Sequence, residues 1–184
     1  MDRSTHLLTP AGLKALAHPL RVQLLSLLRS EGPSTATALA AKVGESSGST
    51  SYHLRQLAAA DLVAEDTERG NARDRWWKAA QATTRLESTS LDDDPGTQAA
   101  ADTYLSLVAQ GHHRRLQDWI STARTWRGAW RDSGTIDDWQ LSLSAKELAQ
   151  LSTEVEALVE TYRRDPRKGD QRVAVHYVAF PVKP

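Results

Sequence analysis

Three segments near the start of the chain decide the fold: LAHPLRVQLL at residues 16–25, TATALAAKV at residues 35–43 and STSYHLRQL at residues 49–57. Pro19 suits the first turn of a helix, and that helix carries an apolar stripe formed by Leu20, Leu24, Leu27 and Leu28. Gly44 ends the second segment, and the residues ESSG at 45–48 form a turn before a helix at 48–60. The spacing therefore predicts three packed helices, the last two joined by a tight turn.

A hairpin follows these helices, because the apolar period changes after residue 60. Residues 62–66 (LVAED) and 73–78 (RDRWWK) are predicted strands, and the polar tip between them contains Gly70 and Asn71. Two helices around a turn, followed by a wing at 62–78, predict a winged helix-turn-helix domain within residues 1–80. Its helix at 48–60 would place short polar side chains and one arginine where a DNA major groove receives them.

The chain changes character after this domain. Residues 81–96, rich in Thr, Ser, Asp and Gly, are predicted to be a linker. A long helix is predicted at 97–130, and its helical period indicates that one face is buried along almost the whole length. That face is formed by Ala101, Leu105, Val108, His112, Leu116, Trp119, Ala123, Trp126 and Trp130.

Two strands and one more helix are predicted further on. Residues 139–143 alternate between apolar and polar, which favours a short strand, and Ser144 with Glu147 fits a capping box at the start of a helix. Residues 172–180 are rich in β-branched and aromatic types and apolar on both faces, so we expect a strand covered on both sides. The predicted fold is mainly α with small β: a winged helix-turn-helix domain plus a smaller α-β-α-β C-terminal domain at 97–184.

Composition narrows the class of protein. The 23 basic and 23 acidic residues balance, and residues 1–80 hold 10 Lys/Arg against 8 Asp/Glu, so charge alone does not indicate a nucleic-acid partner. The absence of cysteine excludes disulfides and thiolate metal ligands. No apolar run approaches the roughly 20 residues that span a bilayer, and the first six residues lack the apolar stretch of a secretion signal. We expect a cytoplasmic protein with no membrane partner.

The residues LAHPLR at 16–21 and SYHLRQL at 51–57, with Leu62-Val63 before a basic wing, resemble the ArsR family of bacterial transcriptional regulators. The resemblance covers about residues 10–80. It implies a homodimeric winged-helix regulator, a repressor, whose helix at 48–60 enters the major groove of operator DNA. Asp61 departs from the glycine that the family often has there, which implies a local change in the turn. The second half resembles only in general shape the companion domain of some actinobacterial regulators of this type, and no effector-binding residues carry over.

The candidate DNA-binding residues lie on the helix and on the wing. On the helix they are Ser49, Thr50, Ser51, His53, Arg55 and Gln56, and on the wing they are Arg69, Arg73 and Arg75. Hydroxyls near a helix N-terminus can donate hydrogen bonds to DNA phosphates. Gln can hydrogen-bond the edge of adenine and Arg that of guanine, whereas arginines on a wing are expected to contact the DNA backbone. The alternatives are that Ser49 or Ser51 only caps the helix, that His53 is packed inside, and that the wing is a solvated hairpin. We expect Glu68 and Asp74 to be too few to neutralise the wing arginines.

Two interpretations of the aromatic residues stay open. Tryptophans at helical spacing usually form a core or a dimer interface. Thr9 and Pro10 predict a further short helix that runs to Ala17, and we expect this first helix and the helix at 97–130 to hold the dimer. The sharper interpretation is a pocket for a small organic effector lined by His112, Arg115, Trp119, Trp126, Trp130 and Trp139.

Metal sensing and catalysis find little support in the sequence. His112 and His113 are neighbours that point about 100° apart on a helix, unlike an i, i+4 ligand pair, so no metal site and no cofactor are expected. No phosphate loop or nucleophile motif is present, so we do not expect an enzyme. The alternatives to a DNA-binding regulator are a winged-helix module that binds protein or RNA and, with less support, a metal-responsive repressor.

Overall fold

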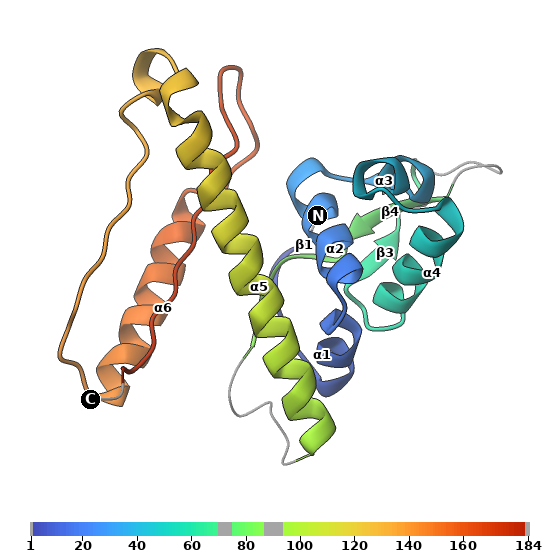
Figure 1. The fold of residues 1–184 in the computed structure, drawn as a ribbon, viewed down its shortest axis with the longest axis horizontal. Coiled ribbons are helices and arrows are strands. Elements are labelled where there is room, and N and C mark those ends of the chain that lie inside the picture. Colours follow the sequence, from blue (N-terminus) through green and yellow to red (C-terminus); the bar gives the residue numbers. More distant parts are fainter. Residues whose placement is uncertain (1, 70–74, 87–93, 183–184) are drawn as a thin grey trace. The chain divides into compact units, whose positions relative to one another are not determined.

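The computed structural model describes residues 2–69, 75–86 and 94–182 of the 184-residue chain, coloured along the sequence in Figure 1. The backbone contacts divide the chain into unit 1, Met1–Gln117, and unit 2, Asp118–Pro184. Each unit is described by itself.

Unit 1 contains the predicted helices. They are α1 (Pro10–Leu16), α2 (Pro19–Glu31), α3 (Ala36–Val43) and α4 (Ser47–Ala58). Each begins at a side chain that accepts a backbone N–H, namely Thr9, His18, Thr35 and Ser46 respectively. Because Ser46 caps α4, neither Ser49 nor Ser51 does so, and that alternative is wrong.

The two strands of the wing join a short strand that precedes α3 in a three-stranded antiparallel sheet beside these helices (Figure 1). Its order is β2 (Ser34–Thr35), β4 (Trp76–Ala79) and β3 (Val63–Glu65), with Val63 opposite Ala79 and Ser34 opposite Trp77. The predicted winged helix-turn-helix is confirmed. The predicted tip at Gly70 and Asn71, and Arg73 with it, lies outside the described residues.

The core of unit 1 is leucine-rich. Its fully buried members include Leu13, Leu16, Leu24, Leu28, Leu39, Leu54, Leu57 and Leu62. They come from α1 to α4 and the start of the wing, so the apolar stripes read from the sequence meet in one cluster. This cluster fixes α4 with one face inward.

Asp61 lies in the turn between α4 and β3 with a φ of 56°. This left-handed conformation costs a residue with a Cβ atom about 1–2 kcal/mol, and glycine adopts it freely. The departure from glycine therefore leaves the turn in a glycine-like conformation. Aspartate is one of the few other residues that tolerate it.

The prediction that residues 81–96 form a linker is wrong for the first residues of that range. Residues 81–85 form β5 (Gln81–Arg85), which pairs in parallel with β1 (Asp2–Leu7). The β-branched residues Thr83 and Thr84 suit a strand, a signal that the polar composition of the segment masked. Arg29 of α2 supports this strand, since its Nε donates to the Gln81 carbonyl at 3.1 Å. Burial lowers the pKa of Arg29 to about 10.

The long helix α5 (Pro95–Thr122) ends earlier than predicted, and short 3-10 turns follow at η2 (Ala123–Thr125) and η3 (Gly128–Trp130). The Thr122 hydroxyl donates to the Asp118 carbonyl at 2.8 Å, and such local bonds compete with the backbone ladder near a helix end. Only Thr97, Ala100 and Ala101 of α5 are buried. The expectation of burial along almost the whole helix is therefore wrong for a single chain, because α5 extends beyond the core against which its first turns pack.

Unit 2 contains α6 (Ala145–Thr161), and the capping box between Ser144 and Glu147 is confirmed. The strands predicted at 139–143 and 172–180 are absent from the described residues, which are extended there without strand pairing. A strand is stable only when it pairs with another strand, and neither segment joins a sheet in the described part of this chain. The α-β-α-β pattern is thus wrong for one chain, whereas the mainly helical fold with a small antiparallel sheet is confirmed.

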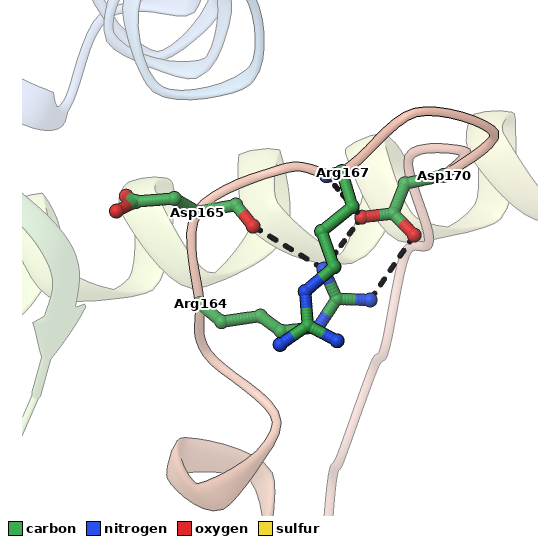
Figure 2. A network of polar contacts seen from close by, with 4 residues as sticks. All are labelled: Arg164, Asp165, Arg167 and Asp170. Atoms are coloured by element: carbon green, nitrogen blue, oxygen red, sulfur yellow. Dashed lines mark hydrogen bonds and ion pairs between the residues drawn. The ribbon is translucent and has the colours of Figure 1, made fainter.

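A polar turn connects α6 to the extended residues 171–182 (Figure 2). Arg164 pairs with Asp170 through two contacts, at 2.6 and 3.0 Å, and the Arg167 N–H donates to the same carboxylate at 2.6 Å. These bonds, with that of Arg164 first among them, lower the pKa of Asp170 to about 2. No helix in the described part of the chain is long and apolar enough to cross a membrane.

Candidate nucleic-acid interface

The inward face of α4 anchors the helix. Leu54 and Leu57 are fully buried, and Thr50, one turn earlier, is also 0% exposed. The Thr50 hydroxyl has no hydrogen-bond partner among the described residues. Thr50 was predicted to contact DNA, but it faces the core because it lies four and seven residues from the other inward positions. It is therefore removed from the candidate interface.

The outward face of α4 carries Tyr52, Arg55 and Gln56, all exposed, with Ser49 and Ser51 half-buried beside them. Their spacing of three and four residues places these side chains on one side of the helix. Tyr52, which is 52% exposed, was missing from the predicted set of DNA-binding residues. Its position opposite Leu54 and Leu57 was the available signal.

His53 is packed between aromatic rings. Its ring centroid lies 4.5 Å from that of His18 and 5.2 Å from that of Tyr52. The Nδ1 of His18 accepts the Leu20 N–H at 3.2 Å and so caps α2. Burial, followed by the charges of His18 and Arg21, lowers the pKa of His53. This arrangement supports the packed interpretation of His53.

A cavity of about 290 Å³ lies where α3, α4 and the wing meet. It is lined by Thr35, Ala36, Thr37, Ser51, Arg55, Arg75 and Trp77. The Nε of Arg55 donates to the Ser51 carbonyl at 3.1 Å, and the Arg75 guanidinium lies 5.8 Å from the centre of the Trp77 ring. The cavity combines two guanidinium groups with hydroxyls and the first turn of α3. Groups of these kinds can bind a phosphate of the DNA backbone.

The wing carries more negative charge than expected. Asp66, whose side chain is 6% exposed, lies 3.2 Å from Lys78 and 3.5 Å from Arg69, and Glu65 lies 3.2 Å from Arg75. Counting only Glu68 and Asp74 against the wing arginines was wrong, because Glu65 and Asp66 at the base of the wing also pair with them. Lys78 is an additional cation that the prediction missed, although it stands in the predicted strand.

The residues of the predicted effector pocket are only partly brought together. Trp126 and Trp130 lie 6.4 Å apart, and Trp119 packs against Gly134, where an added Cβ atom would come within 2.9 Å of the indole. Trp139 is 73% exposed. Burial first, and then Arg115, lowers the pKa of His112. None of the six residues lines the cavity beside α4 or the hollow on α5 at Ala109, Gln110, His113, Arg114 and Gln117. The pocket stays a prediction.

Metal ligands do not gather in the described part of the chain. No three His, Cys, Asp or Glu side chains among residues 2–69, 75–86 and 94–182 are placed to hold one ion.

Comparison with known proteins agrees with the domain seen here. Residues 16–66 match the model of a family described as a helix-turn-helix domain. The chain therefore carries a helix-turn-helix domain, which includes α2, α3, α4 and β3. No curated protein matches the chain.

Solved structures show a weaker similarity. A double mutant of ZitR from Lactococcus lactis, in apo form, is 16% identical over 80% of this chain and 84% of that chain, with a TM-score of 0.33. The adhesin competence repressor AdcR from Streptococcus pyogenes is 16% identical over 78% of this chain and 80% of that chain, also with a TM-score of 0.33. At these TM-scores the similarity says nothing about function.

Proposed function

We propose that this protein is a transcriptional regulator of the ArsR type, a repressor that binds specific double-stranded DNA as a homodimer. The observation that carries the proposal is the outward face of α4, where Tyr52, Arg55 and Gln56 are exposed while Leu54 and Leu57 hold the helix in the core. A helix that is fixed on one side and polar on the other suits insertion into a major groove. The helix-turn-helix match over residues 16–66 supports the same function.

Gln56 and Arg55, the two residues of α4 expected to contact bases, have different roles in this proposal. Gln56 is exposed and can make a bidentate contact to adenine. Arg55 lines the cavity that also contains Arg75, so we assign it to a backbone phosphate, where it fixes the position of α4. This assignment replaces the guanine contact expected for Arg55 from the sequence.

A homodimer would bind a roughly palindromic site with two half-sites about one helical turn apart. A small organic effector in unit 2 remains part of the proposal, as a way to change the spacing of the two recognition helices. Neither feature is needed for the contact between α4 and one half-site.

Binding to the duplex upstream of the protein's own gene, measured over a salt series, tests the proposal. We expect binding at least 10³-fold tighter than to a shuffled duplex. Arg55→Ala and Arg75→Ala should each reduce the slope of log affinity against log salt by about one unit for every phosphate that the arginine neutralises in the wild type. Arg114→Ala, an exposed arginine on α5, is the control that should leave the slope unchanged. Equal binding to shuffled duplex, or preference for RNA or a protein, would refute a sequence-specific DNA regulator.

A further inference from the structure

Unit 2 has the apolar content of an ordinary domain, but its described residues are at most partly buried in a single chain. Apolar residues make up 27 of its 67 positions, about the 40% found in the whole sequence. Nevertheless, not one of its described residues, 118–182, is buried, whereas unit 1 holds a complete leucine core. A folded domain of this composition normally removes such side chains from water.

Six of the exposed apolar side chains of unit 2 come from three of its stretches. They are Ile136, Trp139 and Leu141, then Leu158 on α6, and then Val175 and Phe180 in the extended segment, each between 59% and 73% exposed. We call these six residues the C-terminal apolar surface. Exposed apolar side chains in this number indicate an interaction site, because monomeric proteins rarely leave much apolar surface in water.

The extended segment 171–182 is held in place but lacks a strand partner. The turn fixed by Arg164 and Asp170 (Figure 2) returns the chain toward α6, and the Tyr177 hydroxyl lies 3.5 Å from that of Ser152. Residues 172–180 have a strand composition, yet they pair with no described strand. An unpaired strand of this kind is a template for pairing with another chain.

The exposed surface of the whole chain is larger than that of two compact domains of the same masses. The chain exposes 13195 Å², whereas two separate globules with the masses of the two units would expose only about 10,500 Å². The excess is therefore about 2,700 Å², on the same scaling. Stable obligate dimers bury roughly 1,000–2,500 Å² on each partner. The excess is thus large enough to form one such interface.

The charge of unit 2 favours a copy of itself over a charged partner. Residues 118–184 contain 10 Lys/Arg and 10 Asp/Glu, a net charge of zero. A neutral surface neither attracts a nucleic acid nor repels an identical surface. About a twofold axis, the same segment of a second copy would arrive antiparallel, as strand pairing permits.

We infer that unit 2 forms a shared core with unit 2 of a second copy, in which the C-terminal apolar surface is buried and residues 172–180 pair across the twofold axis. The inference deepens the homodimer in the proposed function but uses no observation on DNA binding. It also explains why a segment with strand composition forms no strand in one chain.

The test is the mass of the full-length protein in solution, measured by light scattering at micromolar concentration. The wild type should have twice the mass of the 20.3 kDa chain. Leu158→Glu combined with Val175→Glu should give the mass of one chain, because both positions are exposed in one chain and buried in the proposed core. Thr153→Glu, on the exposed polar side of α6, is the matched control and should keep the double mass. Circular dichroism should show the same helix content in all three proteins.

A second measurement works even if the double variant fails to fold. The chain has no cysteine, so Val178→Cys carries a single pyrene label, and excimer emission then reports contact between two copies. We expect an excimer at position 178 and none with the label at Thr153→Cys. A wild-type mass of one chain, a double mass that the glutamates leave unchanged, or no excimer at 178 would each overturn the inference. DNA binding is measured separately, so a dimer that binds no DNA refutes the proposed function alone.

Discussion

Replacing Thr50 by valine should stabilise the protein. Thr50 is 0% exposed and its hydroxyl has no hydrogen-bond partner among the described residues. In protein mutants, a buried hydroxyl without a partner costs about 1–3 kcal/mol, and Thr50→Val puts a methyl group of similar size in its place. We therefore expect the free energy of unfolding to rise by about 1–2 kcal/mol, since part of the cost is relieved by local relaxation.

Urea unfolding followed by circular dichroism measures this change. Thr37→Val, at an exposed position on α3, is the control and should change stability by less than about 0.5 kcal/mol. Thr50→Val should also leave affinity for the operator duplex unchanged, because the side chain faces the core. A decrease of about 1 kcal/mol or more in stability would refute the reasoning about the hydroxyl, and a large decrease in DNA affinity alone would return Thr50 to the interface.

Three further predictions concern the pH dependence of stability, the turn at Asp61 and the effect of metal ions on DNA binding. The folded state lowers the pKa of His18 and His53 below the usual 6.5, so the unfolded chain takes up protons first and the free energy of unfolding should fall as pH drops below 6.5. His53→Phe should weaken this pH dependence, measured by urea titrations at about pH 7.5 and 5.5. An unchanged pH dependence in the variant would contradict the prediction. Because Asp61 has a φ of 56°, Asp61→Val should lower the free energy of unfolding by about 1 kcal/mol, whereas Asp61→Gly should leave it unchanged or raise it. Thermal unfolding measures both variants, and the opposite order of stability would exclude a strained turn. Chelators and added zinc should leave the affinity for DNA unchanged, because the described residues offer no cluster of three metal ligands and the chain has no cysteine. A tenfold change in this affinity, about 1.4 kcal/mol, would instead indicate a metal sensor.

The sequence predicted the winged helix-turn-helix well because local signals agree there. Pro19 and Gly44 mark helix ends where they were expected. Leu24 and Leu28 of the predicted stripe are buried, whereas Leu20 and Leu27 are only partly buried and the unpredicted Leu25 is buried. The side chains of α4 were harder to place. An apolar stripe read only from leucines does not show that Thr50 continues it inward, although it lies four and seven residues before Leu54 and Leu57.

The second half was harder to predict because its signals depend on partners. The composition of residues 172–180 indicates a strand, but strand pairing is not local, and one chain supplies no neighbour in the described residues. The apolar face of α5 likewise predicts burial without saying against what. The first turns of α5 meet the core of unit 1 through Ala100, Ala101 and the partly buried Tyr104. The charge of the wing was misjudged because Glu65 pairs with Arg75 and Asp66 with Lys78 across the hairpin. Asp66 also pairs with Arg69, three residues further along the chain.

If the outward face of α4 reads DNA sequence, loss of the Gln56 amide should lower sequence discrimination. The ratio of affinities for the operator and for a shuffled duplex is measured at one salt concentration for the wild type, for Gln56→Ala and for the exposed control Gln23→Ala. Removing one bidentate hydrogen-bond pair to a base costs about 1–3 kcal/mol in discrimination, so Gln56→Ala should lower the ratio by about 5- to 150-fold per half-site while Gln23→Ala leaves it unchanged. A ratio that Gln56→Ala does not change, or that Gln23→Ala lowers equally, would contradict sequence reading by α4.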